Sequence, residues 1–215
     1  KDLAAQNPQK LAELQAVFLQ EAEKHHVLPM DDRVFERLDG AAVGRPDLMA
    51  GRTSLTLAEG MTGMMEGVFI NVKNRSKTIT AEVELPEGIA NGTILAQGGR
   101  FGGWSLYVKK GVPAYGDNFL GLQQPSIVAS KPLAPGKSTL KFVFAYDGGG
   151  LGTLFVNGEE VGAGRIENTQ AGMFSADETA DVGIDLGTPV VEAIGSESAS
   201  KFNGHIPKVT VEVTK

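Results

Sequence analysis

Short segments with a period of two dominate the chain after residue 34. In KTITAEVEL (77–85) every second side chain is apolar, and a similar alternation occurs in STLKFVFAYD (138–147) and KVTVEV (208–213). Alternation of this kind indicates half-buried β-strands. Turn residues separate the segments, and many short strands at intervals of about eight to twelve residues predict an antiparallel sandwich or barrel.

Other segments fit the same pattern and complete the predicted strand set. Glycine accounts for 28 of the 215 residues, which suits many tight turns. Asn157-Gly158 is the strongest hairpin signal, because a type I′ turn needs a positive φ at both central residues. We therefore predict a mainly β fold, an antiparallel β-sandwich of concanavalin-like or jelly-roll type over residues 34–215. Its further strands are expected in SLTLAEG (54–60), GVFINVKN (67–74), GTILAQGG (92–99), WSLYVKK (104–110), SIVASKPL (126–133) and GTLFVNG (152–158).

Residues 1–33 differ from the rest and predict one N-terminal amphipathic helix and a linker. Asn7-Pro8 is a helix start, with the Asn7 side chain expected to accept a backbone N–H and proline suited to the first helical position. Pro29 is expected to end the helix, which we place at residues 8–26. Its apolar stripe needs a partner surface, and it consists of Leu11, Leu14, Phe18 and Ala22.

Composition excludes several classes of function. The net charge of -6 and the absence of any Lys/Arg block argue against nucleic acid and anionic membranes as partners. No apolar run reaches the roughly 18 residues that a transmembrane helix requires. Without cysteine the chain can hold no zinc ribbon, thiol nucleophile or disulfide.

EAEKHHVLPMDDR (21–33) holds two of the three histidines, flanked by acidic residues. Glu21 and His25 are four apart on one helix face, and Asp31 or Asp32 could complete a metal site. The alternative is the polar end of a helix, where cationic side chains interact favourably with the last carbonyls, and where the aspartates pair with Arg33 or Arg37. The sequence favours the second interpretation, because only one pair has a fixed spacing.

SADETADVGID (175–185) is a second acidic cluster. Its Asp177, Asp181 and Asp185, together with Glu178, could offer oxygen ligands to calcium. Their spacing fits no EF-hand loop, however, and acidic residues are common in turns between strands. We assign no metal site in this chain and keep the three aspartates as weak candidates.

GGRFGGWSLYV (98–108) concentrates aromatic residues among glycines. Trp104 and Tyr107, joined by Phe101 and Tyr115, could form a sugar-binding face. The alternative, which the sequence favours, is that Trp104 and Leu106, or Phe101 and Tyr107, are core residues next to a glycine hairpin, because aromatic side chains mainly fill cores. His205 is expected to be a surface histidine, and YDGGGLG (146–152) a turn, because neither a Lys-Ser/Thr pair nor a helix follows its glycines.

Four segments carry a resemblance to a known family. NPQKLAELQAVFLQEAEKHHVLPMDDR (7–33), YDGGGLGTLFVNGEEVGAGRI (146–166), SADETADVGIDLGTPV (175–190) and FNGHIPKVTVEV (202–213) occur in the order found in the C-terminal part of bacterial arylsulfatases. These are type I sulfatases of the alkaline-phosphatase superfamily. The resemblance spans essentially the whole chain, and the start at Lys1 agrees with a piece of a longer protein.

The resemblance implies a parent protein that hydrolyses sulfate esters. Such enzymes use a formylglycine, made in a C/S-x-P-S/T-R signature, beside calcium or magnesium. SKPLA (130–134) comes nearest to the signature but lacks its hydroxyl residue and arginine, so no catalytic residue and no cofactor is assigned to this chain. We expect a non-catalytic accessory domain, inactive alone, whose partners are the missing catalytic domain and a sulfated ester or glycan. The sequence leaves the compartment, periplasmic or cytoplasmic, open.

A free-standing, lectin-like carbohydrate-binding module is the alternative function. It would bind sugar directly, without a catalytic partner.

Overall fold

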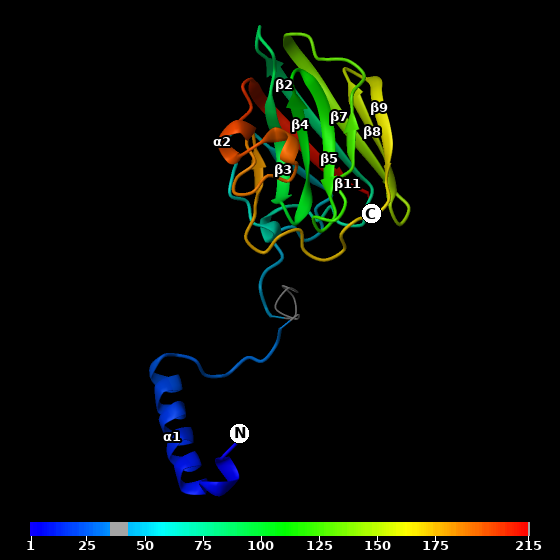
Figure 1. Ribbon diagram of the computed structural model, residues 1–215. Coiled ribbons are helices and arrows are strands. Elements are labelled where there is room, and N and C mark those ends of the chain that lie inside the picture. Colours follow the sequence, from blue (N-terminus) through cyan, green and yellow to red (C-terminus); the bar gives the residue numbers. More distant parts are fainter. Residues whose placement is uncertain (35–42, 215) are drawn as a thin grey trace. The chain divides into compact units, whose positions relative to one another are not determined.

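The computed structural model describes residues 1–34 and 43–214 (Figure 1). The chain divides into two compact units, Lys1–Asp47 and Leu48–Lys215. The domain boundary predicted between residues 33 and 34 adjoins residues 35–42, which lie outside the described residues. Among the described residues, no helix is both long and apolar enough to cross a membrane.

The first unit contains the predicted helix. A 3-10 turn, η1 (Ala4–Gln6), precedes α1 (Pro8–Lys24), which begins at the expected proline. The expected Asn7 cap is wrong: the Asn7 side chain accepts no helix N–H, and its amide instead donates to the Leu3 carbonyl at 3.2 Å. Leu11, Leu14 and Phe18 are exposed on the helix, whereas Ala22 is buried.

The end of α1 also differs from the expectation that Pro29 stops the helix. His26 has a φ of 55°, and two backbone bonds close the last turn: His26 N–H donates to Glu23 O at 3.2 Å and Val27 N–H to Ala22 O at 2.8 Å. This is a Schellman motif, in which a residue in the left-handed conformation turns the chain and satisfies the final carbonyls. The helix therefore ends several residues before the proline.

The second unit is an antiparallel β-sandwich, as predicted (Figure 1). One sheet has the strand order β1-β11-β2-β7-β8-β9 and the other β10-β3-β4-β5-β6. We call them sheet A and sheet B. The strands of sheet A are β1 (Ser54–Leu57), β2 (Lys77–Leu85), β7 (Gly136–Tyr146), β8 (Gly150–Val156), β9 (Glu159–Ile166) and β11 (His205–Val213). Those of sheet B are β3 (Gly92–Gly99), β4 (Gly102–Lys109), β5 (Val112–Asn118), β6 (Ser126–Val128) and β10 (Ala180–Val182).

The alternating side chains fill the space between the sheets. In β2, residues 77, 79, 81, 83 and 85 are buried, and a stack of aromatic rings joins the sheets. The Tyr115 and Phe142 ring centroids lie 3.6 Å apart, and the Trp104 ring lies 6.1 Å from that of Tyr115 in a nearly parallel orientation. The predicted Asn157-Gly158 turn joins β8 to β9 with φ values of 50° and 86°, which confirms the hairpin.

One predicted strand is wrong. GVFINVKN forms no strand; it follows the 3-10 turn η3 (Glu66–Val68) as an irregular segment. Phe69 and Ile70, neighbours in sequence, are both buried, and a strand would point them to opposite faces of a sheet. The segment therefore closes one end of the core with its backbone outside both sheets.

The outer face of sheet B is covered by a late segment of the chain. This segment contains η4 (Glu192–Ile194) and the short helix α2 (Glu197–Ser200), drawn in orange beside β3 in Figure 1. Its Val190, Val191 and Ile194 pack with Tyr107 and Ala114 in a second apolar cluster, which Ala96 completes. Sheet B is thus buried on both faces, and the exposed sheet face belongs to sheet A.

Candidate functional site

Three chain segments that are distant in sequence meet at one end of sheet A. Strand β2 lies between β11 and β7, and Lys77 at its start pairs with Val213 on one side and Phe144 on the other. The residues just before β2, just after β11 and at the end of β7 must therefore lie together. They line a pocket of about 480 Å³ formed by Asn74, Arg75, Ser76, Tyr146 and Thr214.

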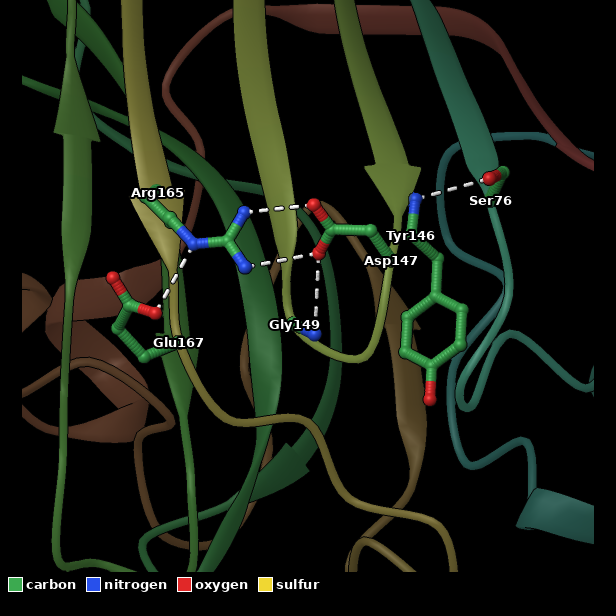
Figure 2. Close-up of polar contacts among 6 residues, drawn as sticks. All are labelled: Ser76, Tyr146, Asp147, Gly149, Arg165 and Glu167. Atoms are coloured by element: carbon green, nitrogen blue, oxygen red, sulfur yellow. Dashed lines mark hydrogen bonds and ion pairs between the residues drawn. The ribbon is translucent and has the colours of Figure 1, made fainter.

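Hydrogen bonds hold these segments in place. Ser76 is the centre of the arrangement: its Oγ accepts from the Tyr146 N–H at 3.0 Å, as Figure 2 shows, and its carbonyl accepts from the Thr214 N–H at 3.0 Å. Asn74 is fixed separately, because its Oδ1 accepts from the Thr169 hydroxyl at 2.7 Å. The pocket is consequently built on backbone and side-chain bonds rather than on a free loop.

Tyr146 supplies an aromatic ring to the pocket. The ring packs on Phe144 with a centroid distance of 6.5 Å and is half-buried at the end of the core. In Figure 2 it points away from Asp147, its neighbour in sequence. Its hydroxyl makes no hydrogen bond to any residue of the two described ranges. A ring with an apolar face and a free polar tip suits a ligand that has both hydroxyl and C–H surfaces.

A second pocket adjoins the first and shares Thr214 with it. It also has a volume of about 480 Å³ and is lined by Thr53, Thr78, Glu212, Val213 and Thr214. Thr78 and Glu212 stand opposite each other on β2 and β11, on the exposed face of sheet A. We call the two hollows the Thr214 pockets. Three threonines, a serine and a tyrosine contribute hydroxyl groups to them.

The Thr214 pockets carry opposite charges at their two ends. Arg75 lies in the first pocket and Glu212 in the second, and both residues are exposed. Neither side chain forms an ion pair with another residue in the described part of the chain. The guanidinium and the carboxylate are therefore available to a ligand.

An ion-pair cluster supports the turn beside Tyr146. Figure 2 shows Arg165 of β9 holding both oxygens of Asp147, with N···O distances of 2.9 and 3.0 Å, while its Nε donates to Glu167 at 3.1 Å. The hydrogen bonds from Arg165 lower the pKa of Asp147, and those to Asp147 and Glu167 raise the pKa of Arg165. Residues 147–149 form a turn, as expected for YDGGGLG. Asp147 is paired with Arg165, and the second carboxylate, Glu167, leaves the cluster with one net negative charge.

The structure places Trp104 and Tyr107 on opposite faces of sheet B. Trp104 is fully buried between the sheets, where its Nε1 donates to Gln97 at 3.1 Å. Tyr107 is 4% exposed, beneath the late segment. Tyr115 is also fully buried, whereas Phe101 is 73% exposed. The four residues do not form one exposed aromatic face. Trp104 and Leu106 are both fully buried, as one form of the core interpretation predicts, whereas the exposed Phe101 does not join them.

The three candidate aspartates have separate environments. Asp177 is exposed and accepts from the Ser175 hydroxyl. Asp181 is buried, with its two oxygens bonded to the Gly63 N–H at 2.7 Å and the Thr179 hydroxyl at 2.9 Å. Asp185 is fully buried. One of its oxygens accepts from the Val190 N–H at 3.0 Å, and the other has no partner in the described residues.

Burial raises the pKa of Asp185 to about 7, with smaller contributions from Asp181 and Glu178. Glu178 itself accepts from the Thr188 hydroxyl at 2.6 Å. Over residues 1–34 and 43–214, no three His, Asp or Glu side chains converge as metal ligands. The acidic segment is therefore a set of loop-stabilising carboxylates in this structure.

Two of the three histidines each lie beside a glutamate. His25 lies 3.2 Å from Glu21, one helical turn earlier, and Asp31 pairs with Arg33 at 2.8 Å. His205 is exposed and lies 3.5 Å from Glu59. These contacts agree with the polar helix end and the surface histidine that the sequence favours.

Sequence reasoning missed the residues of the Thr214 pockets. Tyr146 stands in a predicted strand as one more alternating aromatic, and Asn74, Arg75, Ser76 and Thr214 form no motif. The signal that could have found them is the pairing order of β11, β2 and β7, which a single sequence does not reveal.

No family model matches the chain, and no curated protein matches it. Solved structures show the fold. The CBM40 domain of a Ruminococcus gnavus sialidase, bound to α2,3-sialyllactose, is 16% identical with a TM-score of 0.50 over 76% of this chain and 92% of that domain. A pentraxin from Limulus polyphemus (16% identity, TM-score 0.45) is matched over 76% of this chain and 78% of that chain. Domains LG4-5 of mouse laminin α1 (15% identity, TM-score 0.44) are matched over 76% and 39%. The chain thus has the β-sandwich fold seen in the CBM40 domain.

Proposed function

We propose that residues 48–214 form a lectin-like carbohydrate-binding module with its ligand site in the Thr214 pockets. The observation that carries the proposal is the lining of these pockets: an aromatic ring with a free hydroxyl, several further hydroxyls, an amide and two unpaired charged groups. A saccharide presents hydroxyls at its edge and C–H groups on its face, so it matches both kinds of lining. The CBM40 domain that shares the fold is itself bound to sialyllactose.

Glycan binding tests the proposal directly. The whole chain should bind members of an array of neutral, sialylated and sulfated oligosaccharides, and titration calorimetry should give the affinity. Tyr146→Ala should abolish this binding, because it removes the ring that the sugar would stack on. Tyr146→Phe keeps the ring on Phe144 and should lose only the contribution of the hydroxyl, about 1 kcal/mol.

Phe101→Ala is the matched control, because Phe101 is an exposed aromatic outside the Thr214 pockets. Its removal should leave binding unchanged. Loss of binding in Phe101→Ala with retention in Tyr146→Ala would move the site to the glycine-rich β3–β4 turn. An array on which no saccharide binds would overturn the proposed function.

The sulfatase parent is a second proposal and rests on the resemblance of four segments of the sequence to bacterial arylsulfatases. In it the module is attached to a catalytic domain that contains a C/S-x-P-S/T-R signature, formylglycine and calcium or magnesium. Reading the coding sequence upstream of Lys1 tests it, and a signature there would support it. The isolated chain should not hydrolyse an aryl sulfate ester, with or without calcium; turnover would contradict an accessory role.

A further inference from the structure

We infer that the Thr214 pockets select acidic glycans, with Arg75 contacting a carboxylate or sulfate group of the ligand. The inference rests on the proposed function and assigns its ligand class. Arg75 and Tyr146 line the same pocket, so an anion bound to the guanidinium would belong to a sugar lying against Tyr146.

Among the described residues, the surrounding charges leave Arg75 as the cation available at this end. Lys73, two residues earlier, is half-buried and paired with Glu66, and Arg165 is engaged by Asp147 and Glu167. Arg75 is exposed and forms no ion pair within the described ranges. A guanidinium offers a planar fork of donors, which matches the two oxygens of a carboxylate or sulfate.

The same charges orient the ligand. Asp147 lies beside Tyr146 in sequence, and both of its oxygens are paired with Arg165, although Glu167 on the same guanidinium leaves the cluster with one net negative charge. Glu212 is the unpaired anion of the second pocket, across Thr214. An acidic group is therefore favoured at the Arg75 end, and a neutral, hydroxyl-rich sugar at the Glu212 end, where the carboxylate can accept its hydroxyls.

Three related probes test the inference by titration calorimetry: lactose, 3′-sialyllactose and 3′-sulfolactose. The native chain should bind one or both acidic probes at least about tenfold more tightly than lactose. Arg75→Gln should lower the affinity for the preferred acidic probe by about tenfold and change the affinity for lactose by less than about twofold. Arg75→Lys should fall between, because it retains the charge without the fork. A higher salt concentration should weaken the binding of the acidic probes but not that of lactose.

Lys110→Gln is the charge-matched control: it removes one exposed cation from the β4–β5 turn, outside both pockets. It should leave all three affinities unchanged. Preference for one acidic probe distinguishes a carboxylate from a sulfate ester as the recognised group. Equal binding of lactose and both acidic probes, unaffected by Arg75→Gln, would overturn the inference and leave the carbohydrate-binding proposal intact. Failure of all three probes, with an empty glycan array, would overturn both.

Discussion

The Nζ atom of Lys77 lies 5.1 Å from the centroid of the Trp104 ring, in the space between the two sheets. Lys77 begins β2 on its inward face, and the rings of Tyr115 and Phe144 also lie within 6 Å of its ammonium, at 5.7 and 5.5 Å. Burial lowers the pKa of Lys77 to about 8, although the nearby charge of Asp117 partly opposes this shift. Burial also raises the pKa of Asp117 to about 6. Lys77 in the core and the partly buried Asp117 are thus two ionisable groups whose charged forms burial disfavours.

Removing both buried charges should stabilise the protein. The double variant Lys77→Met/Asp117→Asn keeps the side-chain volumes similar, and the amide oxygen introduced at position 117 can still accept from the Tyr115 hydroxyl. We expect its free energy of unfolding at neutral pH, measured by urea denaturation, to rise by about 3 kcal/mol. Lys77→Met alone should raise the free energy of unfolding by less, because Asp117 then loses its neighbouring cation. A double variant less stable than the native chain would show that the two charges stabilise the core.

The stability of the native chain should also rise with pH between about 8 and 10. Lys77 has its pKa lowered from 10.5 to about 8 on folding, so in this window the unfolded chain binds more protons and the slope of stability with pH is positive. In Lys77→Met this contribution is absent. The difference in unfolding free energy between the variant and the native chain should therefore shrink as pH rises from 8 to 10, and a constant difference would contradict the assignment.

Asp185 should make the protein less stable as pH rises from about 4 to about 7. Its pKa is raised on folding from 3.8 to about 7, so the folded chain binds the extra proton between these values and loses stability as pH increases across them. Asp185→Asn retains an acceptor for the Val190 N–H and cannot ionise. Urea denaturation should show a gain of about 2 kcal/mol at pH 8 and a much smaller one at pH 5. An equal effect at both pH values would exclude ionisation as the cause.

Gly98 and Gly158 require glycine for two different physical reasons. Both have a positive φ, 92° and 86°, but a Cβ on Gly98 would lie 2.1 Å from the Gly102 carbonyl oxygen, whereas one on Gly158 meets nothing within 4 Å. Gly158→Ala should cost about 1 kcal/mol of unfolding free energy through conformation alone. Gly98→Ala should cost about 3 kcal/mol, because backbone must also move. Equal losses would mean that the β3–β4 hairpin accommodates the methyl group.

His26, the residue in the left-handed conformation at the end of α1, allows a local test. His26→Gly should stabilise the Schellman motif by about 1 kcal/mol, because glycine adopts the positive φ at little cost. Hydrogen exchange of the Val27 amide, which bonds to Ala22, should slow about fivefold. His25→Gly, at a position with a φ of -100°, is the control and should give no such protection.

Local patterns predicted the elements whose structure depends on neighbours in sequence. The alternation in KTITAEVEL places its apolar residues inward in β2, and Asn157-Gly158 forms the expected hairpin. These patterns succeed because strand periodicity and turn conformation are properties of a few consecutive residues. GVFINVKN fails because adjacent buried residues close the end of the core, and nothing within the segment indicates that role.

The sequence by itself determined the antiparallel sandwich, its Asn157-Gly158 hairpin and the amphipathic helix, together with the exclusion of cysteine chemistry. Only the tertiary structure decided which residues share a surface. It buried Trp104 and Tyr107 on opposite faces of sheet B, since the late segment covers the outer face, and it separated the three candidate aspartates. It also joined Asn74, Arg75 and Ser76 to Tyr146 and Thr214. The physical reason is strand order: hydrogen-bonded pairing of β11, β2 and β7 brings together positions that lie far apart in sequence.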